Sequence, residues 1–559
     1  MAEVETRVRA ARGPELRCRG WRQEAILRLL ENVLEVGERP EELVVYAGHA
    51  KAARDWESYE RIVESLKSLR DGQTLVLQSG KAVGVFPTHP LAPAVVMANG
   101  VLVGRWSTPE QFYELEDRGL TIFGGLTAGA WQYIGAQGVI QGTYETFAAV
   151  ARDHFGGSLA GRLVVSAGMG GMGSAQPLAI TVLDGVLLNA EVDAEKLERR
   201  RLEGYIDRTT EDLDEALRWA QEAAAERRPL SVGVPVNAVE LLERLLERSV
   251  TPDVVTDLTC AHDLRYGYIP MGMSVAEAAE LRRADPGALV ARGKEATVRH
   301  VRAMLELRRR GAVVFDYGND IRPNAAEVGL PEALDIDIFT QRYLRPLFCR
   351  GIGPFRWICV SGAVEDRDAI DDMCLELFAD EPRVTTWIEL ARAHVPLQGL
   401  PARICWLGHG ERSRLALAVN EAVADGRLSG PVAFSRDHMD SGAMTHPYII
   451  SERMRDGSDA IADWPVLDAL LLTASGADLV AFHAGGGGYA GYSMSAGVTV
   501  VADGSRSAAI RLPRTLDADS GLGVLRHAEA GYEIAQEEAE AAGLGLDRDD
   551  VGGYPEAAV

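Results

Sequence analysis

One segment, residues 164–193, constrains the fold of this chain more than any other. An apolar run (163–167) leads directly into GMGGMG (168–173), which satisfies the pattern G-x-G-x-x-G. A stretch of helical length and a second apolar run (186–190) follow. In a β-α-β unit this order places the glycines at the strand-to-helix turn, where the backbone can approach a pyrophosphate and the helix N-terminus offers free N–H groups. The segment therefore predicts a dinucleotide site.

Glu191 strengthens this interpretation. It ends the second apolar run, roughly 20 residues past the turn, where a carboxylate can accept hydrogen bonds from an adenosine ribose. A glycine-rich turn in an unrelated fold is the alternative, because the glycine pattern alone is weak evidence. Strand, turn, helix, strand and carboxylate in this order favour the dinucleotide.

The same alternation continues along the chain and predicts the fold class. With the two runs already named, apolar runs separated by helical segments predict five parallel strands: 163–167, 186–190, 230–236, 253–258 and 312–317. We expect an α/β protein with a doubly wound, Rossmann-like NAD-binding domain at 140–345. No linker rich in Pro or Ser borders it, so we expect it to be inserted in a larger α/β core domain built from residues 1–139 and 346–545, followed by an acidic tail, 546–559.

Composition excludes several classes of function. Lys and Arg total 58 against 82 for Asp and Glu, a net charge of −24, which argues against nucleic acid or an anionic membrane as a partner. No apolar run reaches the roughly 18 residues of a membrane span, and the first residues lack the apolar region of a secretory signal. The six cysteines are scattered without a C-x-x-C pair, so we expect a cytoplasmic protein without a metal site.

Cys405 and Arg356 are candidates whose residue types leave two interpretations open. Cys405 lies in an apolar run, which favours buried packing over a reactive thiol. Arg356 follows the segment GIGP (351–354), and its guanidinium suits either a carboxylate substrate or a structural ion pair.

The histidines also leave more than one interpretation open. His438 lies between two acidic positions in RDHMDSG (436–442) and could transfer protons or cap a loop. His262 and His483 favour structural roles. From these residues alone, an NAD-dependent dehydrogenase is the natural hypothesis.

These segments together resemble urocanase (urocanate hydratase). The resemblance runs from GWRQEA (20–25) to RHAEAGYEIA (526–535). Its most specific parts are QGTYETF (141–147), HFGGSLAGR (154–162), GMGGMG, RPLFCRGIGPFRW (345–357), QGLPARICW (398–406) and DGSDAIADWP (456–465).

The resemblance implies a different chemistry from that of a dehydrogenase. It implies that NAD+ is tightly bound, is not consumed, and acts as an electrophile toward the ring of an imidazole acrylate, to which water is then added to give an imidazolone propionate. The protein then contributes orientation and proton transfer. The resemblance also implies a cytoplasmic homodimer.

Carried over by position, the resemblance assigns three groups of residues. The catalytic candidates are Cys405, Asp440, His438 and Tyr46, and the substrate-binding candidates are Arg356, Gly125 and Ala484. The cofactor-binding candidates are Ala47, Gly48, Gly171, Met172, Gly173, Glu191, Lys196, Asn237, Ala238, Leu258, Thr259, Cys260, Ala261, His262, Tyr268, Ile269, Tyr317 and Gly487.

Several positions depart from the urocanase pattern and bear on the substrate. Gly125 replaces a glutamine, Ala484 a second histidine and Ile449 an arginine. These changes remove hydrogen-bonding groups and volume, which favours a ring-modified substrate such as thiourocanate or S-methyl thiourocanate. Plain urocanate, and an NAD-binding relative without catalysis, are the alternatives.

Overall fold

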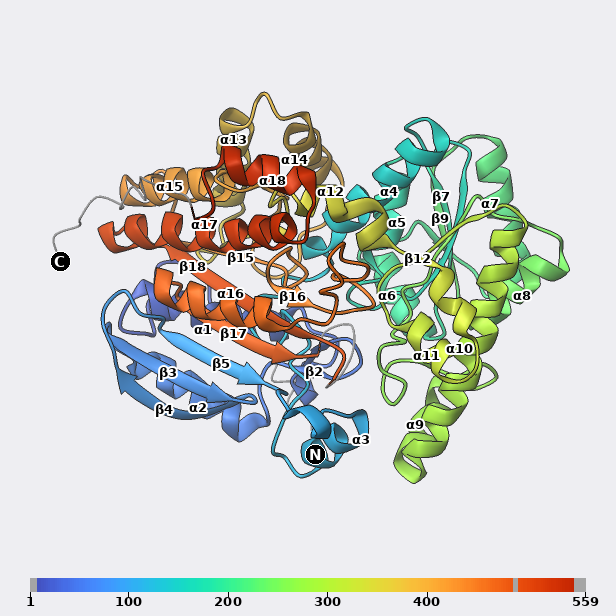
Figure 1. Ribbon diagram of the computed structural model, residues 1–559, viewed down its shortest axis with the longest axis horizontal. Coiled ribbons are helices and arrows are strands. Elements are labelled where there is room, and N and C mark those ends of the chain that lie inside the picture. Colours follow the sequence, from blue (N-terminus) through green and yellow to red (C-terminus); the bar gives the residue numbers. More distant parts are fainter. Residues whose placement is uncertain (1–7, 486–490, 547–559) are drawn as a thin grey trace.

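Two α/β bodies lie side by side in the protein (Figure 1). The computed structural model describes residues 8–485 and 491–546. The middle of the chain, teal through green to yellow in Figure 1, forms one body, which we call the nucleotide domain. Both ends of the chain, blue and orange to red, form the other body, which we call the core domain.

The nucleotide domain is built on a parallel sheet. Its described strands follow the order β12-β11-β10-β6-β7-β9-β8, and neighbouring strands in this order run parallel. Strands β9, β7, β6, β10, β11 and β12 give the 3-2-1-4-5-6 order of a doubly wound fold, so the predicted fold class is confirmed. The bounds are β6 Leu163–Ala167, β7 Val186–Ala190, β8 Arg208–Thr209, β9 Leu230–Val234, β10 Val254–Val255, β11 Val313–Asp316 and β12 Asp337–Ile338.

The sequence prediction of five strands was incomplete. It missed β8 and β12, because each contains two residues and carries too little apolar pattern to be recognised. Strands β6, β7 and β9 are buried along their whole length, which explains why they read as continuous apolar runs.

Helices cover the nucleotide sheet, and several of them begin at side-chain caps. Asn237 caps α8 in a reciprocal pair with Glu240, and Asp193 and Asp212 cap α6 and α7 through their carboxylates. The bounds are α4 Ile140–Phe155, α5 Ala175–Thr181, α6 Ala194–Leu202, α7 Leu213–Ala225, α8 Ala238–Glu247, α9 Val275–Ala284, α10 Pro286–Arg309 and α11 Ile321–Glu327.

The core domain is built on a mixed sheet that takes strands from both sides of the nucleotide domain. Within the described residues its order is β14-β13-β15-β18-β17-β5-β3-β4, with β16 paired to β18. The bounds are β3 Gln73–Gln78, β4 Lys81–Pro87, β5 Val95–Asn99, β13 Phe355–Cys359, β14 Ala402–Ile404, β15 Val432–Arg436, β16 Met444–Thr445, β17 Leu479–Ala484 and β18 Met494–Ala502, and a separate hairpin pairs β1 Val44–Tyr46 with β2 Ala50–Lys51. The pairing of β17 with β5 joins the two halves of the core domain, as predicted for an inserted domain; the exact domain limits stay predictions.

Helices of the core domain pack against this sheet. Their bounds are α1 Trp21–Glu35, α2 Trp56–Ser68, α3 Pro109–Asp117, α12 Arg345–Phe348, α13 Val364–Leu377, α14 Pro382–His394, α15 Glu411–Ala424, α16 Asp463–Ser475, α17 Arg506–Glu529 and α18 Glu533–Ala541. Buried ion pairs tie helices to strands: Asp478, before β17, contacts Arg22 of α1 and Arg511 of α17. None of the described helices combines the length and hydropathy that a membrane span requires.

Candidate dinucleotide site and the polar cluster behind it

The turn after β6 requires glycine at both of its ends. Gly168 has a φ of +90°, and a Cβ there would lie 2.3 Å from the carbonyl oxygen of Leu258. A Cβ on Gly173 would lie 2.3 Å from the carbonyl oxygen of Gly168. Side chains at these positions would push β6, β10 and the start of α5 apart, so the glycines are needed for this close packing.

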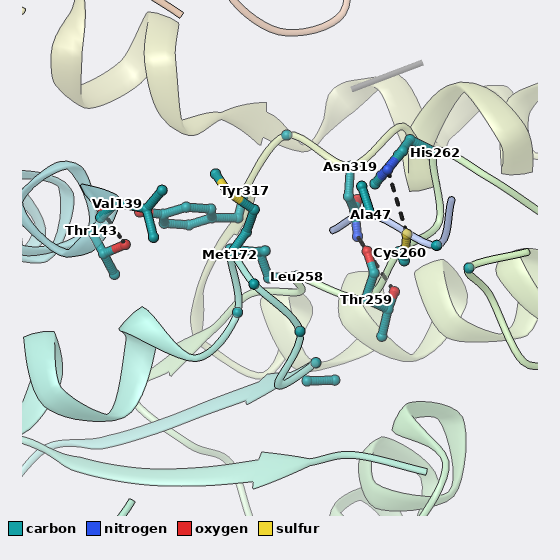
Figure 2. A pocket seen from close by; sticks show the side chains of 18 of the residues that line it. Ala47, Val139, Thr143, Met172, Leu258, Thr259, Cys260, His262, Tyr317 and Asn319 are labelled. Carbon is teal, nitrogen blue, oxygen red and sulfur yellow. Dashed lines mark hydrogen bonds between the residues drawn. The ribbon is translucent and has the colours of Figure 1, made fainter. Parts of the chain in front are cut away.

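A pocket opens over this turn, at the carboxyl ends of the parallel strands. It holds about 1630 Å³ of empty space, part of it open to solvent. Doubly wound sheets bind ligands at this edge. The predicted cofactor-binding residues in its wall are Ala47, Gly48, Gly171, Met172, Gly173, Glu191, Lys196, Asn237, Ala238, Leu258, Thr259, Cys260, His262, Tyr268, Ile269 and Tyr317. Figure 2 shows several of them converging from separate loops.

Two predicted cofactor-binding residues are not in this wall. Ala261 is fully buried and packs in the core of the nucleotide domain, beneath the loop that carries its neighbours. Gly487 lies outside the described residues.

Glu191 holds one end of the pocket in shape. Its two carboxylate oxygens accept hydrogen bonds from the backbone N–H groups of Met169 (2.7 Å) and Asp193 (3.1 Å). Its charge raises the pKa of Lys196, although burial opposes this shift. A carboxylate has about four acceptor positions, so Glu191 keeps capacity for a hydroxyl ligand.

Glu38 is a pocket residue that the sequence analysis missed. It comes from the segment after α1, and its Oε1 accepts a hydrogen bond from the N–H of Gly171 at 2.8 Å. The turn therefore already offers a backbone donor to an oxyanion, as an anion-binding turn does.

Cys260 and His262 contact each other within one loop of the pocket wall. Sγ of Cys260 lies 3.4 Å from Nε2 of His262 (Figure 2). Burial raises the pKa of Cys260 well above its ordinary value, and burial lowers the pKa of His262. The pair is therefore a neutral thiol and a neutral imidazole, not a thiolate–imidazolium pair.

The structure does not bring Cys405 to the pocket. Its neighbours Ile404 and Trp406 line the wall, but Cys405 is fully buried and its thiol lies beside Cys374 of α13. Burial raises its pKa well above the ordinary value, with Cys374 adding to the shift. This geometry fits the packing interpretation and does not support the catalytic role suggested by the resemblance.

Asp440 also lies behind the wall. Its carboxylate forms a buried pair with Arg412 through two contacts of 2.5 and 3.2 Å, and Arg436 lies 3.6 Å away. It is absent from the pocket wall. The predicted proton-transfer residue is therefore held in a structural ion network.

Both ring nitrogens of His438 form hydrogen bonds with neighbouring groups. The amide N–H₂ of Gln132 donates to the carbonyl of Val498 (2.8 Å) and to Thr499 (3.0 Å), so Oε1 of Gln132 must accept from Nε2–H of His438 at 2.9 Å. Nδ1 of His438 then accepts from the hydroxyl of Ser495 at 3.3 Å. Burial lowers its pKa well below the ordinary value, with the neighbouring imidazole and arginines adding to the shift. His438 has no free nitrogen for the predicted proton transfer.

Tyr46 carries a buried phenol. Its oxygen accepts hydrogen bonds from the N–H of Leu126 (3.0 Å) and the hydroxyl of Thr127 (3.2 Å). Burial raises its pKa to about 12, so it stays protonated at neutral pH. It does not line the pocket.

Arg356 lies one layer behind the pocket. It donates to Oδ2 of Asp437 at 3.0 Å and to the carbonyl of Gln132 at 3.2 Å. Asp437 lines the pocket, whereas Arg356 is fully buried. Arg356 thus orients a pocket carboxylate and does not face the pocket itself.

Gly125 and Ala484 also lie outside the pocket wall. Gly125 has a φ of +57°, and a Cβ there would lie 2.8 Å from Cβ of Ala50. Ala484 ends β17 and is 2% exposed. The departures from the urocanase pattern predicted extra space at these two positions. In the structure both positions are closely packed.

These buried side chains form a second group, here called the polar cluster: Asn99, Gln132, Arg356, Asp437, His438 and His483. Gln132 contacts both Arg356 and His438, and the rings of His438 and His483 are stacked at 5.2 Å. Asp437 joins the cluster to the pocket. Sequence analysis missed Gln132, Asn99 and Asp437, although Gln132 follows a glycine-rich segment and the other two follow or end strands.

His49 clamps the two domains together beside the pocket. Its Nε2 lies 3.2 Å from Glu116 of α3, and its Nδ1 lies 3.2 Å from Asp263 of the nucleotide domain. Its ring stacks on Tyr266 at 4.3 Å. Burial alone would lower its pKa, but the two carboxylates outweigh burial and raise the pKa to about 9.

Comparisons with known proteins agree with the fold. The Urocanase N-terminal domain matches residues 8–132, the Urocanase Rossmann-like domain matches 135–343, and the Urocanase C-terminal domain matches 346–541.

Individual proteins are also similar to this chain. S-methyl thiourocanate hydratase from Variovorax sp. (strain JCM 16519 / RA8) is 52% identical over 540 residues, which cover 97% of this chain and 97% of that protein. Among solved structures, L-tryptophan dehydrogenase from Nostoc punctiforme aligns with 37% of this chain and 52% of its own at 13% identity, with a TM-score of 0.16, a likeness too weak to inform fold or function.

We predict that the His49 clamp makes the free energy of unfolding decrease as the pH becomes alkaline. The folded pKa lies above the ordinary value, so protonation of His49 stabilises the fold fully below about pH 6.5 and this contribution is lost as the pH rises through about 9. His49→Gln should lower the melting temperature by several degrees at pH 7 and flatten its decline between about pH 6.5 and 9. If melting temperature declines with pH as steeply in His49→Gln as in wild type, the clamp is contradicted. The exposed His89→Gln is the control.

We predict that alkylation distinguishes the two cysteines. Iodoacetamide reacts with thiolates, and both thiols have raised pKa values, but Cys260 faces the pocket whereas Cys405 is sealed in the core. In cofactor-stripped native protein, peptide mapping should show Cys405 labelled at least about 10-fold more slowly than Cys260. Both should react equally after denaturation. Preferential labelling of Cys405 would place its thiol at the site after all.

Proposed function

The chain belongs to the urocanase family, and from this we propose that it is an NAD+-containing hydratase whose preferred substrate is an imidazole acrylate with a sulfur substituent on the ring, such as S-methyl thiourocanate. The observation that carries the proposal is the 52% identity, over 97% of both chains, to S-methyl thiourocanate hydratase. Plain urocanate is the alternative substrate.

The pocket residues fit NAD+. Gly168 and Gly173 pack without side chains against backbone carbonyls, which keeps the turn tight where a pyrophosphate would approach, and Glu191 lies in the wall where a ribose hydroxyl is expected. The doubly wound strand order supports a nicotinamide half bound toward β10, β11 and β12, and Tyr317 would then help to hold it. When bound, NAD+ supplies an electrophilic ring that withdraws electron density from the imidazole.

The nicotinamide half of the pocket suits a flat ring that carries sulfur. Tyr317 and Phe339 stack there at 4.5 Å with an interplanar angle of 9°, and Met172, Met439 and Trp406 complete the wall. Methionine and aromatic groups pack well against polarizable sulfur and exclude water. This wall supports a methylthio substituent on the substrate.

Ile449 adds to this apolar character. It lies behind the wall, where a Cβ on Gly318 would approach its Cγ2 to 3.1 Å, and its carbonyl accepts a hydrogen bond from Thr340. Gly318 and Thr340 both line the pocket. The position of the family arginine is thus occupied by an aliphatic side chain.

Asp437 is the carboxylate that we assign to proton transfer. It lines the same half of the pocket, and Arg356 holds its Oδ2 while Oδ1 accepts from the N–H of Met439 at 3.2 Å. A fixed carboxylate next to an apolar wall can take a proton from water and return it to the substrate side chain. Cys405, Asp440 and His438 would support the site from behind.

From the resemblance we also propose that the protein is a homodimer in the cytoplasm. An exposed apolar face on α16 offers a surface for the second copy: Val466, Leu467, Leu470 and Leu471 are 39–62% exposed. Such a row on one helix is typical of an interface.

We predict a substrate order that tests the proposal. With co-purified NAD+, kcat/KM for S-methyl thiourocanate should exceed that for urocanate by at least about 10-fold, because a methylthio group buried in an apolar wall contributes roughly 1–3 kcal/mol. The measurement is ultraviolet loss of the acrylate for urocanate, thiourocanate and S-methyl thiourocanate. A preference for urocanate would reject the modified substrate, and accumulating NADH would reject the hydratase.

We predict that Asp437→Asn lowers kcat by about 10²- to 10⁴-fold, the usual range for losing an acid–base group. The amide keeps the size of the side chain, so bound NAD+ should change little, whereas the melting temperature should fall because Arg356 loses the charge it pairs with. Glu222→Gln, in an exposed pair with Arg218 on α7, is the control. A variant with normal kcat would remove Asp437 from the mechanism.

A further inference from the structure

Glu38 of the core domain lies against the glycine turn of the nucleotide domain. Its Oε1 accepts a hydrogen bond from the N–H of Gly171 at 2.8 Å, and a Cβ on Gly170 would lie 3.3 Å from the same oxygen. Glu38, Gly170 and Gly171 all line the large pocket, so a ligand bound there reaches this contact. In doubly wound folds the backbone N–H groups of this turn bind the pyrophosphate of the dinucleotide. A carboxylate of the protein thus accepts from a donor that a pyrophosphate uses.

Two carboxylates accept from this turn, and they differ in their other contacts. Glu191 accepts from two backbone N–H groups, and its charge is the main cause of the raised pKa of Lys196. In the part of the chain that the structure describes, the Glu38 side chain accepts from Gly171 alone, and no Lys or Arg nitrogen lies within 4 Å of its carboxylate. Glu191 is therefore a fixed part of the pocket, whereas the hydrogen bond that holds Glu38 is the one that a pyrophosphate needs.

The main chain at Glu38 is anchored, so that only its side chain has to move. The N–H of Glu38 donates to the carbonyl of Val45, in β1, at 2.9 Å. The carbonyl of Gly171 accepts from the phenol of Tyr133 at 3.4 Å, which is a second contact between the core domain and the turn. Rotation of the Glu38 side chain frees the N–H of Gly171 and leaves both of these contacts unchanged.

Glu38 and a pyrophosphate compete for the N–H of Gly171. A single N–H serves one strong acceptor, and a carboxylate and a phosphate in contact repel each other. The same carboxylate satisfies the N–H when no phosphate is bound, and an unsatisfied N–H on a buried turn would destabilise it. The contact therefore stabilises the turn and opposes the ligand that the turn is built to bind.

We infer that the carboxylate of Glu38 is a stand-in for the pyrophosphate of the cofactor: it holds the turn in the cofactor-free protein and gives up the N–H of Gly171 when the dinucleotide binds. The inference rests on the proposed function, because it takes NAD+ as the ligand. Binding has to replace an internal hydrogen bond, so the affinity for NAD+ is lower than the pocket without Glu38 would give. The turn, in exchange, is already formed when NAD+ arrives.

Calorimetric titration of NAD+ into the cofactor-stripped protein tests the inference. Glu38→Gln keeps the size of the side chain and removes its charge, and Glu38→Ala removes the acceptor as well. Both variants should bind NAD+ at least about fivefold more tightly than wild type, because the competing anion is gone. Glu41→Gln removes the same charge from an exposed position in the same segment and should bind like wild type. Weaker or unchanged binding in both Glu38 variants would overturn the inference.

Two further ligands separate the pyrophosphate from the rest of the cofactor. ADP-ribose contains the pyrophosphate and should gain affinity in Glu38→Ala as NAD+ does. Adenosine contains no phosphate and should bind wild type and Glu38→Ala equally. An equal gain for adenosine and ADP-ribose would mean that Glu38 does not compete with the pyrophosphate, and would overturn the inference.

The turn itself gives a readout that needs no ligand. In the cofactor-stripped protein, Glu38→Ala should lower the melting temperature and speed hydrogen exchange at the N–H of Gly171, because that N–H loses its acceptor. Exchange is measured by mass spectrometry on peptides that cover the turn. With NAD+ bound, wild type and variant should exchange equally there. Unchanged exchange in the stripped variant would overturn the role of Glu38 in holding the turn.

The failures of the two proposals are distinguishable. Unchanged NAD+ affinity in the Glu38 variants of a protein that hydrates the acrylates would overturn the role of Glu38 and leave the hydratase intact. A wild type that neither binds NAD+ nor hydrates any of the three acrylates would overturn the proposed function, and the inference with it.

Discussion

The close approach of Gly168 and Gly173 is the constraint on which the site depends. The carbonyl of Gly168 packs where a Cβ on Gly173 would be, and the carbonyl of Leu258 packs where a Cβ on Gly168 would be. These contacts hold β6, β10 and the start of α5 together, so the backbone N–H groups of the turn face the pocket. Because the turn is this tight, the core domain can reach it, and Glu38 bonds directly to Gly171.

The site is built in two layers that share one carboxylate. The pocket wall is glycine-rich at the turn and aromatic toward β12, while the polar cluster behind it holds buried charges and imidazoles. Asp437 belongs to both layers, because it lines the pocket and pairs with Arg356. A buried carboxylate needs such a partner to remain charged, and the cluster supplies it at a fixed position.

Much of the nucleotide domain could be predicted from sequence because its signals are local. Strands buried on both faces read as continuous apolar runs, and the glycine turn with the following Glu191 has a fixed spacing. The cofactor residues were instead carried over from the urocanase resemblance, and all but Ala261 and Gly487 lie in the pocket wall. Strand β12 was missed because two residues are too few to show a periodic pattern of apolar residues.

The sequence by itself determined the parallel sheet, the glycine turn and the family, since each depends on residues close together in the chain. The tertiary structure alone decided which side chains face the pocket. Cys405 lies between two wall residues yet points to Cys374, because neighbouring residues in extended chain face opposite sides. Gln132 reaches His438 and Glu38 reaches Gly171 although these pairs are 306 and 133 residues apart in the chain, because a hydrogen bond depends on distance and direction in space.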